Sequence, residues 1–230
     1  MGVMKTPLDI EAFLNQTFYG LDTLAMLGDI EDFIDFSESN IDWQKRREIR
    51  RTEHECSEDQ FDDPHFAAQY RDQKLEGVAY RFDVSLTQRV RYAALTSLIT
   101  TVEWVLISLK GSIAFPIPSK PDGKNEAVYL LEVFDNRVGL GLESQINLIE
   151  TLVQVRNCIV HAAGLLKSYK HGVALRQRLA ASHGIKISNI NFLGDGIEIE
   201  QGYLQEVVED AKLWLPHLQK AMHEKGLLKQ

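Results

Sequence analysis

Three polar side chains, Arg156, Asn157 and His161, lie close together in the sequence within residues 149–164. The apolar residues of this segment recur with the period of an amphipathic helix. At about 100° per residue, Arg156 lies in the middle of the apolar stripe, where a helical bundle usually places leucine or isoleucine. Asn157 and His161 then lie on a polar strip beside that stripe. We therefore expect this helix to hold an anion-binding group rather than a purely apolar core face.

An arginine in an apolar stripe requires an anionic partner, because burial of an unpaired charge costs several kcal/mol and arginine stays protonated. The partner is a carboxylate of the same chain, a bound phosphate, or both. Glu103 is the internal candidate, because it interrupts the apolar part of an earlier helix beside Trp104. In the purely structural alternative, Arg156 and Glu103 form a buried pair that sets the helix register, and His161 is a hydrogen-bonded core histidine.

Residues 156–161, with the sequence Arg-Asn-Cys-Ile-Val-His, resemble the motif of the HEPN superfamily (higher eukaryotes and prokaryotes nucleotide-binding). That motif consists of an arginine, a polar residue, three further residues and a histidine. The context is also similar, since the motif lies late on a long helix, Gly164 follows it, and an earlier helix carries Glu103 within an apolar run. The resemblance covers roughly residues 85–225 and leaves residues 1–84 unexplained.

The resemblance implies a metal-independent endoribonuclease, of the kind found among toxins of toxin–antitoxin pairs and effectors of antiviral defence. In such enzymes the motifs of two subunits face each other in a symmetric dimer. Arg156 would hold the scissile phosphate, His161 would act as a general acid–base group, and Asn157 would orient His161 or a phosphate oxygen. Glu103 would be a supporting residue. The implied products are a 2′,3′-cyclic phosphate and a 5′-hydroxyl, and neither a metal nor another cofactor is expected.

Charge is distributed unevenly along the chain. The net charge is −8, yet residues 151–194 contain six lysines and arginines and no aspartate or glutamate, so the rest of the chain carries −14. Such a segment can attract a polyanion although the whole protein is acidic; the alternative is a solvated face balanced by acidic neighbours. Its expected RNA-binding residues are Lys167, Lys170, Arg176 and Arg178. A second basic run precedes it, and we expect a salt-bridged surface there, with RNA contact as the alternative: Lys45, Arg46, Arg47, Arg50 and Arg51.

Periodicity predicts a mostly α-helical fold, a HEPN-like bundle with a small β-hairpin before the last helix. Residues 1–84 are expected to form a helical N-terminal extension with a charged connector, and residues 85–230 the helical core. Ser85 and Gln88 have the spacing of a capping box, which predicts a helix start there. The hairpin is expected around a turn at residues 194–196. One or two short helices are expected over 9–37, and single helices over 85–111, 125–136, 144–169 and 203–224, with a loop rich in proline after residue 111.

Composition places the chain among ordinary globular proteins, with 44% apolar and 25% charged residues. The first residues lack an apolar segment with a cleavage site, so we expect a cytoplasmic protein. The expected partners are RNA, a second copy of the chain, and a cognate antitoxin or other defence protein, and no membrane contact is expected. Two alternatives remain: a non-catalytic HEPN-like module that binds RNA, a nucleotide or a protein, and a monomeric helical scaffold or immunity-type protein.

Overall fold

The computed structural model describes residues 20–57, 61–191 and 194–229. The fold is mostly α-helical with one two-stranded antiparallel hairpin before the final helix, as the sequence predicted. The chain forms two compact units, each assembled from separate segments. The first comprises Met1–Asp29, Thr100–Glu150 and Val207–Gln230, and the second comprises Ile30–Ile99 and Thr151–Glu206. All three residues of the predicted site belong to the second unit.

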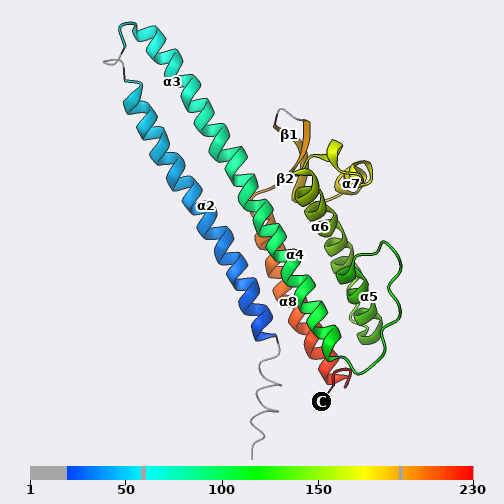
Figure 1. Ribbon diagram of the computed structural model, residues 1–230. Coiled ribbons are helices and arrows are strands. Elements are labelled where there is room, and N and C mark those ends of the chain that lie inside the picture. The colour runs from blue at the N-terminus through cyan, green and yellow to red at the C-terminus, as the bar shows by residue number, and fades with distance from the viewer. Residues whose placement is uncertain (1–19, 58–60, 192–193, 230) are drawn as a thin grey trace, which may run out of the picture. The chain divides into compact units, whose positions relative to one another are not determined.

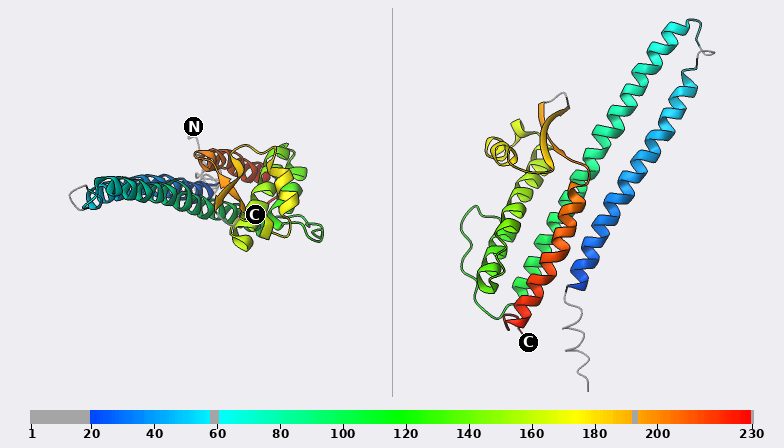
Figure 2. Two further views of the ribbon diagram at one scale, coloured as in Figure 1. Left: turned by 90° about the horizontal axis from the view of Figure 1, so that it is seen from above. Right: turned by 180° about the vertical axis from the view of Figure 1, so that it is seen from behind.

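A pair of long helical segments forms one part of the second unit (Figure 1). Within the second unit, residues 30–55 of helix α2 (Leu21–Glu55) run alongside a helical rod that consists of α3 (Pro64–Ala79), a π-helical segment η2 (Tyr80–Leu86) and residues 87–99 of α4 (Thr87–Ser112). The view from behind shows the same arrangement (Figure 2). Asp63 caps the start of α3, because its carboxylate accepts from the amides of His65 and Phe66. The one or two short helices expected over 9–37 are replaced, from Leu21 onward, by the first part of the longer helix α2. Residues 9–19 lie outside the described part of the chain.

The predicted helix start at Ser85 is wrong. The backbone is helical without interruption from Pro64 to Ser112, and Ser85 lies inside the π-helical segment. The amide of Gln88 bonds to the backbone of Ile199 instead of capping a helix. The Gln88 side chain, predicted to cap a helix start locally, thus forms a tertiary contact with the hairpin. The π-helical segment continues the helix from α3 into α4, so no new helix starts at Ser85.

The rest of the second unit includes most of α6 (Glu143–Ala162), the short η3 (Leu166–Ser168), α7 (Gly172–Leu179) and the hairpin. Strands β1 (Ile185–Asn191) and β2 (Gly194–Ile199) pair with Ile185 opposite Ile199 and Ile187 opposite Ile197. The turn predicted at residues 194–196 is wrong, because these residues belong to β2. The connection between the strands falls at residues 192–193, outside the described part. Helix α6 ends at Ala162 rather than at residue 169, and α7 was not predicted.

The first unit contains α5 (Glu126–Val138) and most of α8 (Tyr203–Glu224). Asn125 caps α5 by accepting from the amides of Ala127 and Val128, and Gly139 ends it in the left-handed conformation. The bounds of α8 are those that the sequence predicted, and Pro216 lies inside the helix. The proline-rich segment before α5 is a loop, as predicted. The core of this unit includes Leu130, Phe134, Leu215 and Leu218, all fully buried.

One helical stretch, Pro64–Ser112, is long and apolar enough to cross a membrane when judged by length and composition alone. Half of its most apolar window is buried inside the fold. A core helix of a water-soluble protein has the same two properties.

Candidate functional site

The site begins where α6 ends. Ala163 follows the helix with φ 51° and Gly164 with φ 79°, so the chain makes a left-handed turn. The amide of Gly164 donates to the carbonyl of Cys158 (3.1 Å), and the Gly164 carbonyl accepts from the amide of Ile197 on β2 (3.0 Å). A non-glycine residue at positive φ is uncommon and is often found at functional positions. The end of α6 is thus anchored to the hairpin by backbone hydrogen bonds.

Tyr92 of α4 supports the same turn. Its hydroxyl donates to the carbonyl of Ile197. Its ring also lies so close to Gly164 that a Cβ atom there would be 2.6 Å from the tyrosine oxygen. Burial, with a smaller contribution from nearby Cys158, raises the pKa of Tyr92 well above its usual range. This residue therefore acts as a neutral hydrogen-bond donor that holds the hairpin and the end of α6 in place.

Arg156 lies among both buried and exposed residues of α6, and this corrects the prediction that it occupies the middle of a buried stripe. Leu152 and Val153, which lie within about 60° of it around the helix, are buried, and Val155 and Cys158 further round are buried too. Arg156 itself is half-buried. Val160, one turn further on the same side, is 56% exposed. The prediction failed because a wheel counts apolar residues equally, whether or not the fold covers them.

Asn157 is half-buried and His161 is exposed, one turn apart on the same strip of α6. The side chain of Asn157 is hydrogen-bonded to the Tyr169 hydroxyl. Burial and then nearby Cys158 raise the pKa of Tyr169, and the Asn157 hydrogen bond opposes this rise. The ring of Tyr169 also meets that of His171 edge-on, with centroids 5.6 Å apart. Tyr169 and His171 are thus neighbours of the site that sequence reasoning missed, because they follow the helix end that it placed too late.

The predicted RNA-binding residues divide into two groups. Lys167 and Lys170 are exposed, and neither forms an ion pair with a carboxylate in the described part of the chain. Arg176 is held by Asp195 of β2, with 2.5 Å between guanidinium nitrogen and carboxylate oxygen. Arg178 is half-buried. Within this segment, the two lysines are therefore the better placed to meet an anion.

A cavity of about 310 Å³ lies beside the end of α6. Its walls come from the π-helical segment, from α4 and from Ala163, two residues after His161. The cavity has the volume of a small ligand site. Its lining combines aromatic, cationic and polar side chains: Tyr80, Val84, Ser85, Gln88, Arg89, Tyr92 and Ala163.

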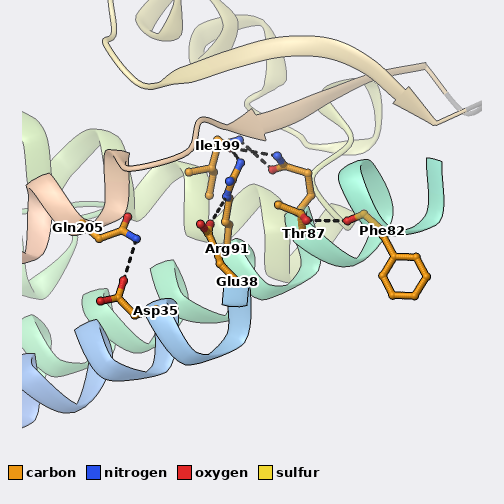
Figure 3. A network of polar contacts seen from close by, with 8 residues as sticks. Asp35, Glu38, Phe82, Thr87, Arg91, Ile199 and Gln205 are labelled. Atoms are coloured by element: carbon orange, nitrogen blue, oxygen red, sulfur yellow. Dashed lines mark hydrogen bonds and ion pairs between the residues drawn. The ribbon is translucent and has the colours of Figure 1, made fainter. Parts of the chain in front are cut away.

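A buried arginine–glutamate pair is present in the second unit at Arg91 and Glu38 (Figure 3). The Nε of Arg91, a residue only 9% exposed, donates to Glu38 Oε1 (2.8 Å), and Nη1 donates to the carbonyl of Ile199 (2.8 Å). Gln88 brackets Ile199, donating to its carbonyl (3.0 Å) and accepting from its amide (2.9 Å). We call these four residues the Arg91 network. It joins α2, α4 and the end of β2, and no sequence pattern indicated it.

Glu103 belongs to the first unit, where it accepts a hydrogen bond from the Asn125 amide (3.2 Å). Arg156 belongs to the second unit. The pairing of Arg156 with Glu103 therefore stays a prediction. Among residues 20–57, 61–191 and 194–229, no three histidine, cysteine, aspartate or glutamate side chains are grouped in a way that could hold a metal ion.

We found no protein-family model, curated protein or solved structure that matches this chain. The HEPN resemblance and the roles that it implies for Arg156, Asn157 and His161 accordingly stay predictions.

Proposed function

We propose that the protein is a metal-independent endoribonuclease that works as a homodimer, with Arg156, Asn157 and His161 as its catalytic residues. The observation that supports this most is the exposure pattern at the end of α6. A half-buried guanidinium and a half-buried amide are followed one turn later by an exposed imidazole. Partial burial restricts the arginine and the asparagine, while the histidine stays open to a substrate. This is the combination that acid–base catalysis on a bound anion requires.

The proposed reaction uses two proton transfers. A base removes the proton of the ribose 2′-hydroxyl, and the 2′-oxygen attacks phosphorus. The bond to the 5′-oxygen breaks, and an acid returns a proton to that oxygen. Arg156 binds the phosphate oxygens in two-point fashion and offsets the charge that develops on them. His161 supplies an imidazole, which takes up and releases protons near neutral pH. Asn157, fixed by Tyr169, orients the imidazole or a phosphate oxygen.

A two-fold dimer would provide both an acid and a base from one motif, one imidazole from each subunit. Val160 supports an interface at this position, because it is an aliphatic side chain 56% exposed and one turn from Arg156. Val160→Glu should therefore convert the protein to monomers and reduce cleavage to background. Val173→Glu is the matched control, since Val173 is 76% exposed on α7 and should tolerate the charge. Analytical ultracentrifugation would contradict the dimer if wild type sedimented as a monomer.

The direct test is incubation of purified protein with mixed RNA in EDTA, followed by mapping of the fragment ends. We expect discrete fragments with 2′,3′-cyclic phosphate and 5′-hydroxyl ends from the wild type. His161→Ala should abolish them while the melting temperature stays within about one degree, because the side chain is exposed. RNA that is bound but never cut would contradict the nuclease and support a non-catalytic RNA-binding module.

An RNA-cleaving protein requires control inside the cell that makes it. We therefore include in the proposal a cytoplasmic location, a role as a toxin or antiviral-defence effector, and a cognate antitoxin or other defence protein as partner. Lys167 and Lys170, exposed beyond the end of α6, are the residues proposed to position the RNA backbone next to the site. Glu103 is retained as a supporting carboxylate.

A further inference from the structure

One face of α2 exposes a tryptophan surrounded by arginines. Trp43, Arg46, Arg47 and Arg50 are spaced at i, i+3, i+4 and i+7, which places them on one side of a helix. All four are exposed, and Trp43 is 54% exposed. Phe36, two turns before Trp43 on the same side, is 74% exposed. We call these five residues the α2 face.

The charges of the α2 face are not neutralised by the acidic residues around it. Glu48 and Glu55 both contact Arg51, at 2.5 Å and 3.4 Å, and Asp83 contacts Lys45 at 2.6 Å. In contrast, none of the three arginines of the α2 face forms an ion pair with a carboxylate in the described part of the chain. The guanidinium of Arg47 instead lies over the Trp43 ring, 5.6 Å from its centroid. Three permanent cations therefore remain available around one aromatic side chain.

The aromatic residues of the α2 face are not part of the core. The opposite side of α2 supplies the buried residues Ile34 and Thr52. The exposed parts of Phe36 and Trp43 therefore do not pack within the unit. They leave a large apolar surface in contact with water. A partner that offers both flat rings and negative charge would match this face in both respects.

We propose that the α2 face binds single-stranded RNA, with Trp43 stacked on a base and Arg46, Arg47 and Arg50 bound to phosphates. Unpaired bases offer open ring faces to aromatic side chains, and the backbone offers one charge per nucleotide. Arginine suits this task because its planar group binds phosphate at two points and also stacks on rings. The inference rests on the proposed function, for which the α2 face is a substrate-capture surface apart from the catalytic residues.

An anionic membrane fits the α2 face less well. A helix that lies on a membrane carries a wide continuous apolar side, whereas the exposed aromatic residues of this stretch, Phe33, Phe36 and Trp43, are interrupted by charged side chains. The same helix exposes Asp32, Asp35 and Asp42, which an anionic lipid surface would repel. A flexible single strand can bind residues 43–50 alone, where Glu48 is the one acidic residue and is already paired with Arg51. Duplex RNA also fits poorly, because its bases are stacked inside the helix.

The test measures binding and does not depend on cleavage. Fluorescence anisotropy of a labelled single-stranded RNA would be recorded with His161→Ala protein, which keeps the RNA intact, at several salt concentrations. In that protein the triple change Arg46→Ala, Arg47→Ala and Arg50→Ala should weaken binding at least about tenfold. It should also reduce the slope of log affinity against log salt by about 2, since each single-strand phosphate contact contributes about 0.7. Trp43→Ala should weaken binding about tenfold and leave the slope unchanged.

Arg51→Ala is the matched control. It removes the same charge from the same helix, but its guanidinium is already engaged by Glu48 and Glu55, so affinity should stay within about twofold of the parent protein. A loss of binding free energy in the control equal to one third of the loss in the triple variant would overturn the proposal, because each charge removed would then count the same wherever it lies on the helix. Tight binding to vesicles containing phosphatidylserine without binding to the single strand would also overturn it. Failure of the nuclease proposal has a different result, namely intact RNA with wild-type protein.

Discussion

The two basic regions of the chain differ in what happens to their charge after folding. Residues 151–194 contain no acid, yet β2 brings Asp195 to Arg176, and Glu200 pairs with Lys186. The run on α2 lies among acids, yet three of its arginines stay open. Glu48 can reach only residues about one turn away, and it contacts Arg51. The charge available to a ligand therefore depends on which carboxylates the fold brings near. Local composition alone indicated that residues 151–194 would have more free positive charge than the run on α2.

The proposed division of work follows from this difference. Half-buried groups at the end of α6 are held in place by neighbours, as chemistry requires. The three arginines of the α2 face are exposed and carry permanent charge, which is suited to capture of a polyanion. Each of the following substitutions affects one of these regions, or both of them, in a predictable way.

The largest expected effect concerns Arg156. Arg156→Ala should lower the rate of RNA cleavage by about 100- to 1,000-fold, the usual loss when a donor to developing charge is removed. Arg156→Lys should recover little, because an ammonium group cannot bind phosphate at two points. Cleavage assays in EDTA measure both. Arg51→Ala serves as the control and should cleave at the wild-type rate; an equal loss there would mean that general charge, not position, matters.

The Arg91 network joins α2 to the end of β2, and β2 also holds the turn after α6 through Ile197 and Gly164. Its disruption should therefore weaken both α2 and the end of α6. Arg91→Met leaves Glu38 without its cation and Ile199 without a donor, and should lower the free energy of unfolding by about 3–5 kcal/mol. Urea denaturation followed by circular dichroism measures the change. Arg89→Met, on the exposed side of the same helix, should change stability by less than about 0.5 kcal/mol. Equal stability of the two variants would contradict a role for the network in holding α2.

A smaller change in stability is expected for a substitution in the turn after α6. Gly164→Ala introduces a Cβ atom 2.6 Å from the Tyr92 oxygen at φ 79°, and should cost about 2–3 kcal/mol. Gly139→Ala is matched in backbone conformation, with φ 73° and open space around it, and should cost only about 1 kcal/mol. Thermal unfolding of both proteins gives the difference. If the two costs are the same, close packing of Tyr92 against Gly164 is not important.

The smallest effect is a pH dependence at Cys158. Burial raises the pKa of this thiol from its ordinary value of 9.0 to about 11. The folded state therefore favours the protonated thiol, and its contribution to stability is complete below pH 9 and is lost as the pH rises towards 11. The stability difference between wild type and Cys158→Ala should shrink over this range, as measured by denaturant unfolding at pH 8 and pH 10.5. A constant difference would contradict the burial of the thiol.

Sequence patterns predicted the elements whose signals are local. The bounds of α8 followed from its regular apolar stripe, and the loop before α5 followed from three prolines that cannot continue a helix. The hairpin followed from a change of period, although its turn was misplaced because glycines also occur inside strands.

The elements that sequence reasoning missed depend on contacts between distant residues. Nothing near Ser85 indicates that the helix continues through a π-helical turn. Gln88 and Arg91 gain their roles only because β2 places Ile199 beside them. The partial burial of Arg156 reflects which parts of α6 the fold covers. The spacing of Arg156, Asn157 and His161 on one helix could be predicted from the sequence alone. The position of Tyr169 near Asn157 could not, because it depends on the turn that follows α6.

The most direct test is single-turnover cleavage of one labelled RNA measured over a range of protein concentrations in EDTA. We predict that Arg156→Ala lowers the rate at saturation and leaves the half-saturating concentration nearly unchanged. The triple change of Arg46, Arg47 and Arg50 to alanine should do the reverse, raising the half-saturating concentration about tenfold at an unchanged maximal rate. A wild-type maximal rate with Arg156→Ala would show that the end of α6 does not perform the chemistry.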